Sequence, residues 1–279
     1  MNGEAFLRSP LVAVGAALVG VLVAVALLAP VLAPYDPHAL AGDALERPST
    51  RHLLGTNHLG QDLLSQLVWG SRPSASVAVG GAALAVLLAL GIGVGAGLVG
   101  GWVDVAAMRV VDVFLALPTL PLLVLVAALT GVSWTSLVIA IGALSWPPMA
   151  RLVRSQALTL RQRGFVEAAR GFGGGVRYIV GRHLTPALAP LLVAAFVAIA
   201  ARAVLLEAGL AFLGLADPTA VSWGLMLHEA LSYPALYFSA LWSWWVLPAG
   251  FAITLAVLGF TFLGVGLEPA FNPRWRRGR

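Results

Sequence analysis

Cysteine and lysine are both missing from this 279-residue chain, and each absence excludes a class of function. Without cysteine there can be no disulfide, no thiolate nucleophile and no metal site built on sulfur. All 17 cationic side chains are arginines. A P-loop needs a lysine on the phosphates of its nucleotide, so this chain does not itself hydrolyse nucleotide by that route.

Charge is scarce as well, with 10% charged against 59% hydrophobic residues and a mean hydropathy of +0.91. A soluble chain of this size has to cover its surface with polar groups, which this composition does not supply. The isoelectric point near 10.7 resembles that of a nucleic-acid binder. The arginines, however, lie mostly between apolar runs, where they set membrane orientation, and no nucleic-acid partner is expected.

The apolar runs are long enough to span hydrocarbon, which takes about 20 residues of helix. We therefore predict an all-α integral membrane protein with about six transmembrane helices. A cleaved signal peptide is the alternative for the first run, but that run is longer than the usual apolar core and ends in Pro30 and Pro34. The predicted helices cover about residues 11–33, 74–99, 105–130, 134–150, 184–215 and 241–267.

These runs divide the chain into residues 1–72, a first helix with an extracytoplasmic segment, and a core of residues 73–267. Within the first part, Asp62 to Trp69 has the spacing of a short amphipathic segment at the membrane interface. The interval 151–183 holds seven arginines and the basic tail 268–279 holds four, whereas residues 217–239 hold none. By the positive-inside rule, both termini and the interval 151–183 face the cytoplasm.

The arginine-rich interval contains a pattern of its own. Residues 165–172 predict a short helix with Glu167 in its first turn, where a negative charge suits the helix dipole. Three glycines, 173–175, end that helix, and a second helical piece is expected over 176–183. A short amphipathic helix on such a loop could lie on the lipid surface or dock into a groove of a soluble partner, and composition alone does not decide between them.

The letters "EAARGFG", followed at a fixed distance by "RHLTP", resemble the signature loop of ABC-importer permeases. The matching positions are Glu167, Ala168, Ala169, Gly173 and Pro186. The dipeptide, oligopeptide and nickel branch usually has Arg-His-x-Leu-Pro at the end of this loop; Arg182 and His183 match it and Thr185 departs.

Four further regions are similar to C-type subunits of that branch. They are "HLLGTNHLGQDLLSQLVWGSRPS", "GGWVDVAAMRVVDVFLALPTL", the pair "EAGLAFLGL" and "SWGLML", and "FTFLGVGLEPAFNPR". The first departs from the family pattern at Asn57, where Asp is usual, and at Gln61 and Gln66, where Arg is usual.

The resemblance implies a type I ABC importer permease fold in a bacterial inner membrane, one half of a translocation pathway. It implies as partners a homologous B-type permease, two ATPase subunits that hold ATP and Mg, and an extracytoplasmic substrate-binding protein. This chain would bind no cofactor and catalyse nothing. The loop would be the coupling helix that seats in the ATPase, and its residues are Arg163, Glu167, Ala168, Ala169, Arg170, Gly173, Arg182, His183 and Pro186. A purely topogenic role is the alternative for Arg163 and Arg170.

Two charges lie inside the fifth predicted span, Arg202 and Glu207. Arg202 could face the pathway and hold a substrate carboxylate. The favoured alternative pairs it with Glu207, with an interfacial group or with the sister subunit. Asp104, Arg109 and Asp112 are expected to form a structural ion cluster at the cytoplasmic membrane edge. His183 and His228 lack neighbours at ligand spacing, so no metal site is expected.

Peptides are the expected cargo, with nickel chelates or glutathione-like thiols as alternatives within the same role. Two other classes of function stay open. An ion-coupled secondary transporter would need buried acids in mid-membrane, for which Glu207 is the candidate. A membrane scaffold without transport activity would need no coupling motif.

Overall fold

The computed structural model describes residues 9–130, 133–217 and 219–271. These residues form helices, joined by turns and by one isolated antiparallel bridge between Thr56 and Asp62. The longer helices are α2 (Pro10–Leu32), α3 (Leu63–Val99), α4 (Gly101–Ala116), α5 (Thr119–Thr130), α6 (Trp134–Ser145), α7 (Pro147–Leu160), α10 (Thr185–Phe212) and α12 (Trp242–Phe271). The shorter ones are α8 (Gly164–Gly171), α9 (Val176–Ile179), the π-helix η1 (Val180–Leu184), α11 (Trp223–Ser232) and the 3₁₀ helix η2 (Pro234–Phe238).

Among the described residues, four continuous helical stretches are long and apolar enough to cross a membrane: Pro10–Leu32, Leu63–Val99, Val176–Phe212 and Trp242–Leu267. Two bent pairs raise the number to six, which agrees with the predicted count. The pair α4–α5 bends by 88° and the pair α6–α7 by 45°. Both bends lie at prolines, since Pro118 precedes α5 and Pro147 opens α7. Proline cannot continue the hydrogen-bond ladder, so the predicted straight helices over 105–130 and 134–150 are corrected to broken ones.

Three element bounds differ from the sequence prediction. The expected interfacial segment Asp62–Trp69 is the first part of α3, because Asp62 caps that helix at its N-terminus through a 2.7 Å bond from Ser65 N. Helix α7 continues to Leu160, so Arg151 and Arg154 lie on a helix. The interval 217–239, which separates the fifth and sixth predicted helices, contains α11 and η2.

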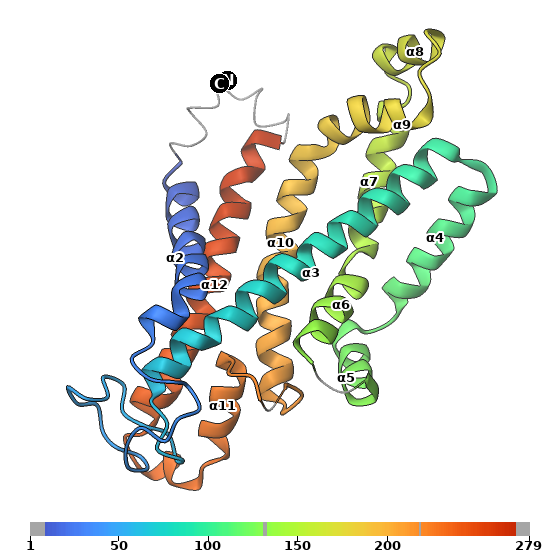
Figure 1. Cartoon of the computed structure of the whole chain (residues 1–279). Coiled ribbons are helices and arrows are strands. Elements are labelled where there is room, and N and C mark those ends of the chain that lie inside the picture. The colour runs from blue at the N-terminus through green and yellow to red at the C-terminus, as the bar shows by residue number, and fades with distance from the viewer. Residues whose placement is uncertain (1–8, 131–132, 218, 272–279) are drawn as a thin grey trace.

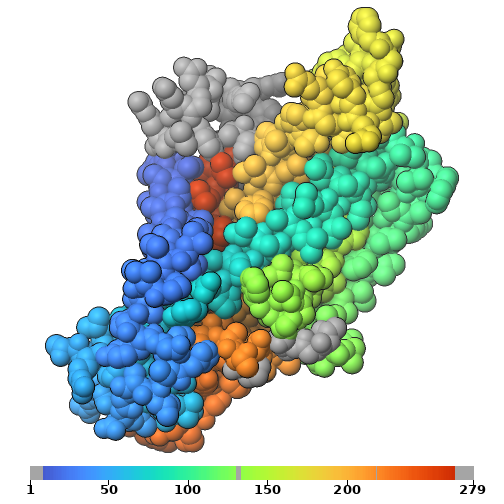
Figure 2. All heavy atoms as spheres, in the orientation of Figure 1, coloured from blue at the N-terminus to red at the C-terminus, as the bar shows by residue number. Residues whose placement is uncertain are grey.

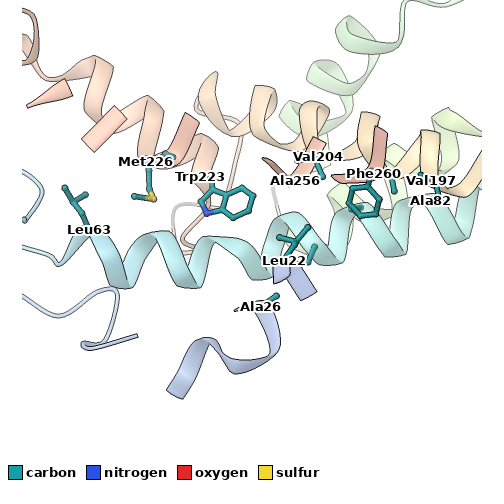
Figure 3. Packing of buried hydrophobic residues seen from close by; sticks show 14 of the residues in the cluster. Leu22, Ala26, Leu63, Ala82, Val197, Val204, Trp223, Met226, Ala256 and Phe260 are labelled. Carbon is teal, nitrogen blue, oxygen red and sulfur yellow. The ribbon is translucent and has the colours of Figure 1, made fainter. Parts of the chain in front are cut away.

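Helix α3 runs obliquely across the molecule and packs against α2, α6, α7 and α10 (Figure 1). Figure 3 shows the apolar cluster along the N-terminal half of α3, where Trp223 of α11 packs over α3. The indole Nε1 of Trp223 donates a 2.8 Å hydrogen bond to Leu67 O. This bond ties α11 to α3 across 156 residues of sequence.

The connection between α2 and α3, residues 33–62, has little regular structure but many internal hydrogen bonds. Buried His52 pairs with buried Asp62 at 3.0 Å. The side chain of Gln61 accepts from both Asn57 Nδ2 and Gln66 Nε2, each at 2.8 Å. Asn57, Gln61 and Gln66, the three departures in this region from the family pattern, are therefore joined by hydrogen bonds. This neutral amide network replaces the acid and the two arginines that are usual in the family.

The molecule has two distinct ends (Figure 1). The α8 end carries α8 and α9, and α2 begins and α12 finishes on the same side. The α11 end, opposite, carries residues 33–62 and α11.

Candidate functional site

Helix α8 projects at the far tip of the α8 end (Figure 1). It spans Gly164–Gly171, close to the predicted 165–172, and Glu167 lies in its first turn as expected. Its one buried side chain is Val166, which joins an apolar cluster with residues of α7 and α3. Glu167, Ala168 and Arg170 are exposed, so one face of α8 holds it to the protein and the other is presented outward.

The glycines end α8 as predicted. Gly173 adopts φ +79°, a left-handed conformation that favours glycine. Its N–H donates to Arg170 O at 2.9 Å, and Gly174 N donates to Ala169 O at 2.8 Å. A Cβ on Gly174 would lie 2.6 Å from Ala169 O, whereas a Cβ on Gly173 or Gly175 would meet nothing within 4 Å. Conformation thus requires glycine at 173, and space requires it at 174.

A cavity of about 520 Å³ lies between α8 and the helix that follows. Its wall is aromatic: Phe165, Phe172, Tyr178 and His183 line it together with Ala169 and the glycine turn. The His183 ring lies 5.8 Å from that of Phe165 and 5.5 Å from that of Tyr178, centroid to centroid. Phe172 is 93% exposed, which is unusual for a phenylalanine in a protein that is complete by itself.

The arginines surround this aromatic cavity without filling it. Arg163, Arg170, Arg177 and Arg182 are all exposed. Arg163 is the N-cap residue of α8 but makes no side-chain capping bond. The resulting surface is apolar at its centre and cationic at its rim.

The way from α8 into the membrane passes through a π-helical turn. The N–H of Thr185 bonds to Val180 O, five residues back, over η1. Pro186 follows at the start of α10, and the wide π turn accommodates it because proline lacks an N–H and its ring crowds the carbonyl four residues earlier. Helices α9, η1 and α10 together form the 37-residue stretch Val176–Phe212.

Ion pairs hold the neighbouring helices together, but the single cluster predicted for Asp104, Arg109 and Asp112 is corrected to two separate groups. Asp112 contacts Arg151 and lies 3.9 Å from Arg109, and Asp104 receives two hydrogen bonds from the Arg154 guanidinium. Arg161 Nη1 donates to Gly97 O at 3.0 Å. The arginines of α7 therefore attach it to α4 and to the end of α3.

Comparison with known proteins identifies the architecture around this loop. Residues 88–277 match the family model described as the binding-protein-dependent transport system inner membrane component. Residues 4–53 match the N-terminal transmembrane domain of oligopeptide transport permease C. The chain belongs to the binding-protein-dependent ABC-importer permeases.

Relatives in this permease family carry different cargo names. A putative peptide permease protein of Brucella suis is 39% identical, with 98% of this chain and 90% of that protein covered. A nickel transport system permease of Escherichia coli is 36% identical over 92% of this chain and 91% of its own length. A glutathione transport system permease of Pectobacterium atrosepticum is 34% identical, covering 96% and 89%. The family match and the apolar helices together show that this chain is a multi-pass permease of a bacterial inner membrane.

Arg202 and Glu207 are kept apart in the permease. Glu207 is 2% exposed and its carboxylate accepts a 2.9 Å hydrogen bond from Ser74 Oγ of α3. Arg202 is exposed, and none of the ion pairs among the described residues includes it. The favoured pairing of these two residues is not observed, because five positions on a helix turn the side chains to different faces.

The sequence did not predict contacts between residues that are far apart along the chain. Ser74 meets Glu207 across 133 residues, and no periodic pattern announces that contact. It also missed Tyr178 and Phe165 as the walls of the aromatic cavity. The amphipathic pattern of α8 could have suggested Phe165, since it lies one turn from Ala169.

Proposed function

We propose that this permease carries di- or oligopeptides inward and is driven by ATPase subunits that bind at α8. Peptide cargo is supported by the relative named as a peptide permease, at 39% identity. The glutathione system is a further peptide-type cargo among the relatives, while the nickel relative keeps the metal chelate as the alternative.

The observation that carries the coupling role is the surface of α8. An exposed helix face, an open aromatic cavity and a rim of arginines form a surface suited to a groove with an acidic rim on a soluble partner. Arg163, Glu167, Ala168, Ala169, Arg170 and Gly173 would supply the contact or its geometry. Arg182, His183 and Pro186 would supply the base from which the loop projects.

The α8 end is the cytoplasmic end in this proposal. The interval 151–183, with seven arginines, leads through α8 and α9 at that end, whereas residues 33–62 at the α11 end hold only Arg47 and Arg51 and residues 217–239 hold none. A homologous B-type permease would complete the pathway, two ATPases would bind at the α8 ends, and a substrate-binding protein would deliver cargo at the α11 end. ATP and Mg would reside on the ATPases.

The packing supplies a route for the movement of α8. Val166 and Ile179 belong to the same buried cluster as Val153 and Ala157 of α7 and Val94 of α3. Because interiors are close-packed, a displacement of α8 is transmitted to α7 and then, through the pairs Arg154–Asp104 and Arg161–Gly97, to α4 and α3. Nucleotide-dependent closure of the ATPases would thus move whole helices.

The test is uptake into vesicles that contain the complete transporter, with its binding protein outside and ATP inside. A labelled dipeptide, nickel chelate and glutathione are offered in turn. We expect ATP-dependent uptake of the dipeptide, and expect Gly173→Val to abolish it, since a β-branched residue at φ +79° is strained. The matched control is Gly181→Val, which lies outside the cavity lining, has no positive φ and has nothing within 4 Å of an added Cβ, so uptake should stay near the original rate.

Uptake of nickel but not dipeptide would overturn the cargo and leave the coupling role intact. Uptake by the chain without any ATPase would overturn the coupling role and favour ion-coupled transport.

A further inference from the structure

A second cavity, of about 630 Å³, lies at the α11 end and is unrelated to the α8 surface. Helix α3 forms its floor, α2 and residues 36–38 one wall, and Trp134 with residues 219–221 the other. Figure 2 shows this face hollowed between the blue α2 and the green α6. The cavity opens on the side of the molecule.

The polar half of this cavity presents one charge of each sign. Arg72 and Asp36 both line it, and none of the ion pairs among the described residues includes either of them. The Arg72 guanidinium stacks over the Trp69 ring at 5.0 Å from its centroid, which restricts its position. Asp36 is oriented by a 2.8 Å hydrogen bond from His38 N.

The apolar half of the cavity continues along the membrane-spanning helices. Leu27 of α2 is 75% exposed and Val79 of α3 is 44% exposed, and both line the cavity with Val23 and Ala75. Trp69 and Trp134 also line the cavity, and Trp134 is held by a 2.8 Å bond from its Nε1 to Ser76 Oγ. Tryptophan at the boundary of polar and apolar surface is typical of the membrane interface.

We infer that this cavity binds a zwitterionic phospholipid of the outer leaflet. The Arg72 guanidinium donates hydrogen bonds to the lipid phosphate, and the Asp36 carboxylate accepts from its ammonium group. The acyl chains lie against Leu27 and Val79. The charges of the site match a headgroup that carries both signs, and its apolar half matches the chains.

The same charges could receive a free peptide, which also has a carboxylate and an ammonium group. The apolar half argues against it, because a dipeptide such as Ala-Ala has too few apolar atoms to cover Val23, Leu27 and Val79. A lipid covers both halves at once. This assignment rests on the orientation given in the proposed function, in which the α11 end is extracytoplasmic, but not on the cargo or on the ATPase contact.

The experiment is native mass spectrometry of the purified full chain in detergent, titrated separately with phosphatidylethanolamine, phosphatidylcholine and phosphatidylglycerol. We expect phosphatidylethanolamine to bind most tightly, since its ammonium donates hydrogen bonds that the quaternary amine of phosphatidylcholine cannot. Arg72→Gln should weaken both phosphatidylethanolamine and phosphatidylglycerol by about tenfold, the effect of losing one charge-assisted hydrogen bond. Asp36→Asn should weaken phosphatidylethanolamine alone.

Matched controls exist on the same side of the molecule. Arg51 and Asp43 are exposed charges that do not line the cavity, so Arg51→Gln and Asp43→Asn should bind lipid like the original chain. Val79→Phe fills the apolar half and should also weaken binding, whereas Leu87→Phe, at a 66% exposed position of α3 outside the cavity, should not. This second pair keeps the test decisive if Arg72→Gln fails to fold.

Equal lipid binding by Arg72→Gln and Arg51→Gln would overturn the proposal. Preference for phosphatidylglycerol that ignores Asp36→Asn would overturn the zwitterionic headgroup. Displacement of phosphatidylethanolamine by the dipeptide Ala-Ala would overturn the lipid in favour of a soluble zwitterion.

Discussion

Residues 33–62 and the loop that carries α8 both extend beyond the membrane-spanning helices, but they differ in which side chains they bury. In residues 33–62, polar groups are turned inward, and His52, Thr56, Asn57 and Asp62 are almost fully buried. In the α8 loop, apolar groups are turned outward: Phe172 is 93%, Val176 64% and Tyr178 55% exposed. Most buried polar side chains of residues 33–62 are paired within the region, with His58 Nδ1 an exception, whereas the exposed aromatic side chains of the α8 loop form a surface suited to a partner.

The glycines of the two ends repeat this contrast. Gly224 at the start of α11 touches α10 so closely that a Cβ would lie 2.4 Å from Ala208 O. Gly175, beside α8, has nothing within 4 Å of such an atom. Gly224 thus marks a close contact between two helices, and Gly175 marks an open position.

Loss of the Asp62 carboxylate should have the largest effect on stability. Asp62→Ala removes the cap of α3 and leaves buried His52 and Ser65 without their partner. We expect the free energy of unfolding to fall by about 2–4 kcal/mol. Unfolding followed by circular dichroism in detergent measures it, with Asp43→Ala as the exposed control. Equal stability of the two variants would remove the claim that residues 33–62 are held by their buried polar groups.

Gly224→Ala should come next, because the added methyl group forces α11 away from α10. Overpacking of this kind costs about 1–3 kcal/mol. Gly175→Ala, at an unstrained φ and in open space, should change stability by less than about 0.5 kcal/mol. A thermal unfolding series on both variants checks the difference, and similar losses would contradict the contrast between the two ends.

Arg154→Gln sharpens the comparison within the α8 end. It breaks the two bonds to Asp104 that join α7 to α4, and the pair is partly exposed, so about 1 kcal/mol is expected. Arg109→Gln is the control, because Arg109 is 80% exposed and only 3.9 Å from Asp112. Urea unfolding of the two variants gives the comparison. A greater loss of stability in Arg109→Gln would contradict the claim that Arg154 attaches α7 to α4.

The smallest effect concerns Glu229 of α11. Burial raises its pKa, while electrostatic interactions with His58, His228 and His38 act in the opposite direction. A carboxyl whose pKa is raised in the fold favours the protonated form there, so its ionisation opposes folding above that pKa and the opposition disappears as the pH falls below the unfolded value. Glu229→Gln should therefore raise the melting temperature at pH 7, with a smaller gain near pH 4. A larger gain in melting temperature at pH 4 than at pH 7 would contradict burial as the cause of the raised pKa.

Local features of this chain followed from its sequence. Helix α8, its acidic first turn and its glycine end depend on neighbours along the chain, and the structure has them at the expected positions. The span count followed from apolar length. The predictions of unbroken spans and of an Arg202–Glu207 pair were wrong. One span bends by 88° at Pro118, and Glu207 accepts a hydrogen bond from Ser74 of another helix instead of pairing with Arg202. Hydropathy measures how apolar a segment is, and it contains no information about which distant residue will face it.

The most direct test of the central claim measures folding and partner binding in the same protein. Glu167→Ala with Arg170→Ala changes only exposed positions of α8, and ATPase recovered with the purified permease is compared with that for Gly181→Val and the original chain. The account predicts loss of the ATPase with the double variant at an unchanged melting temperature. Full recovery of the ATPase, or its loss only together with unfolding, would contradict it.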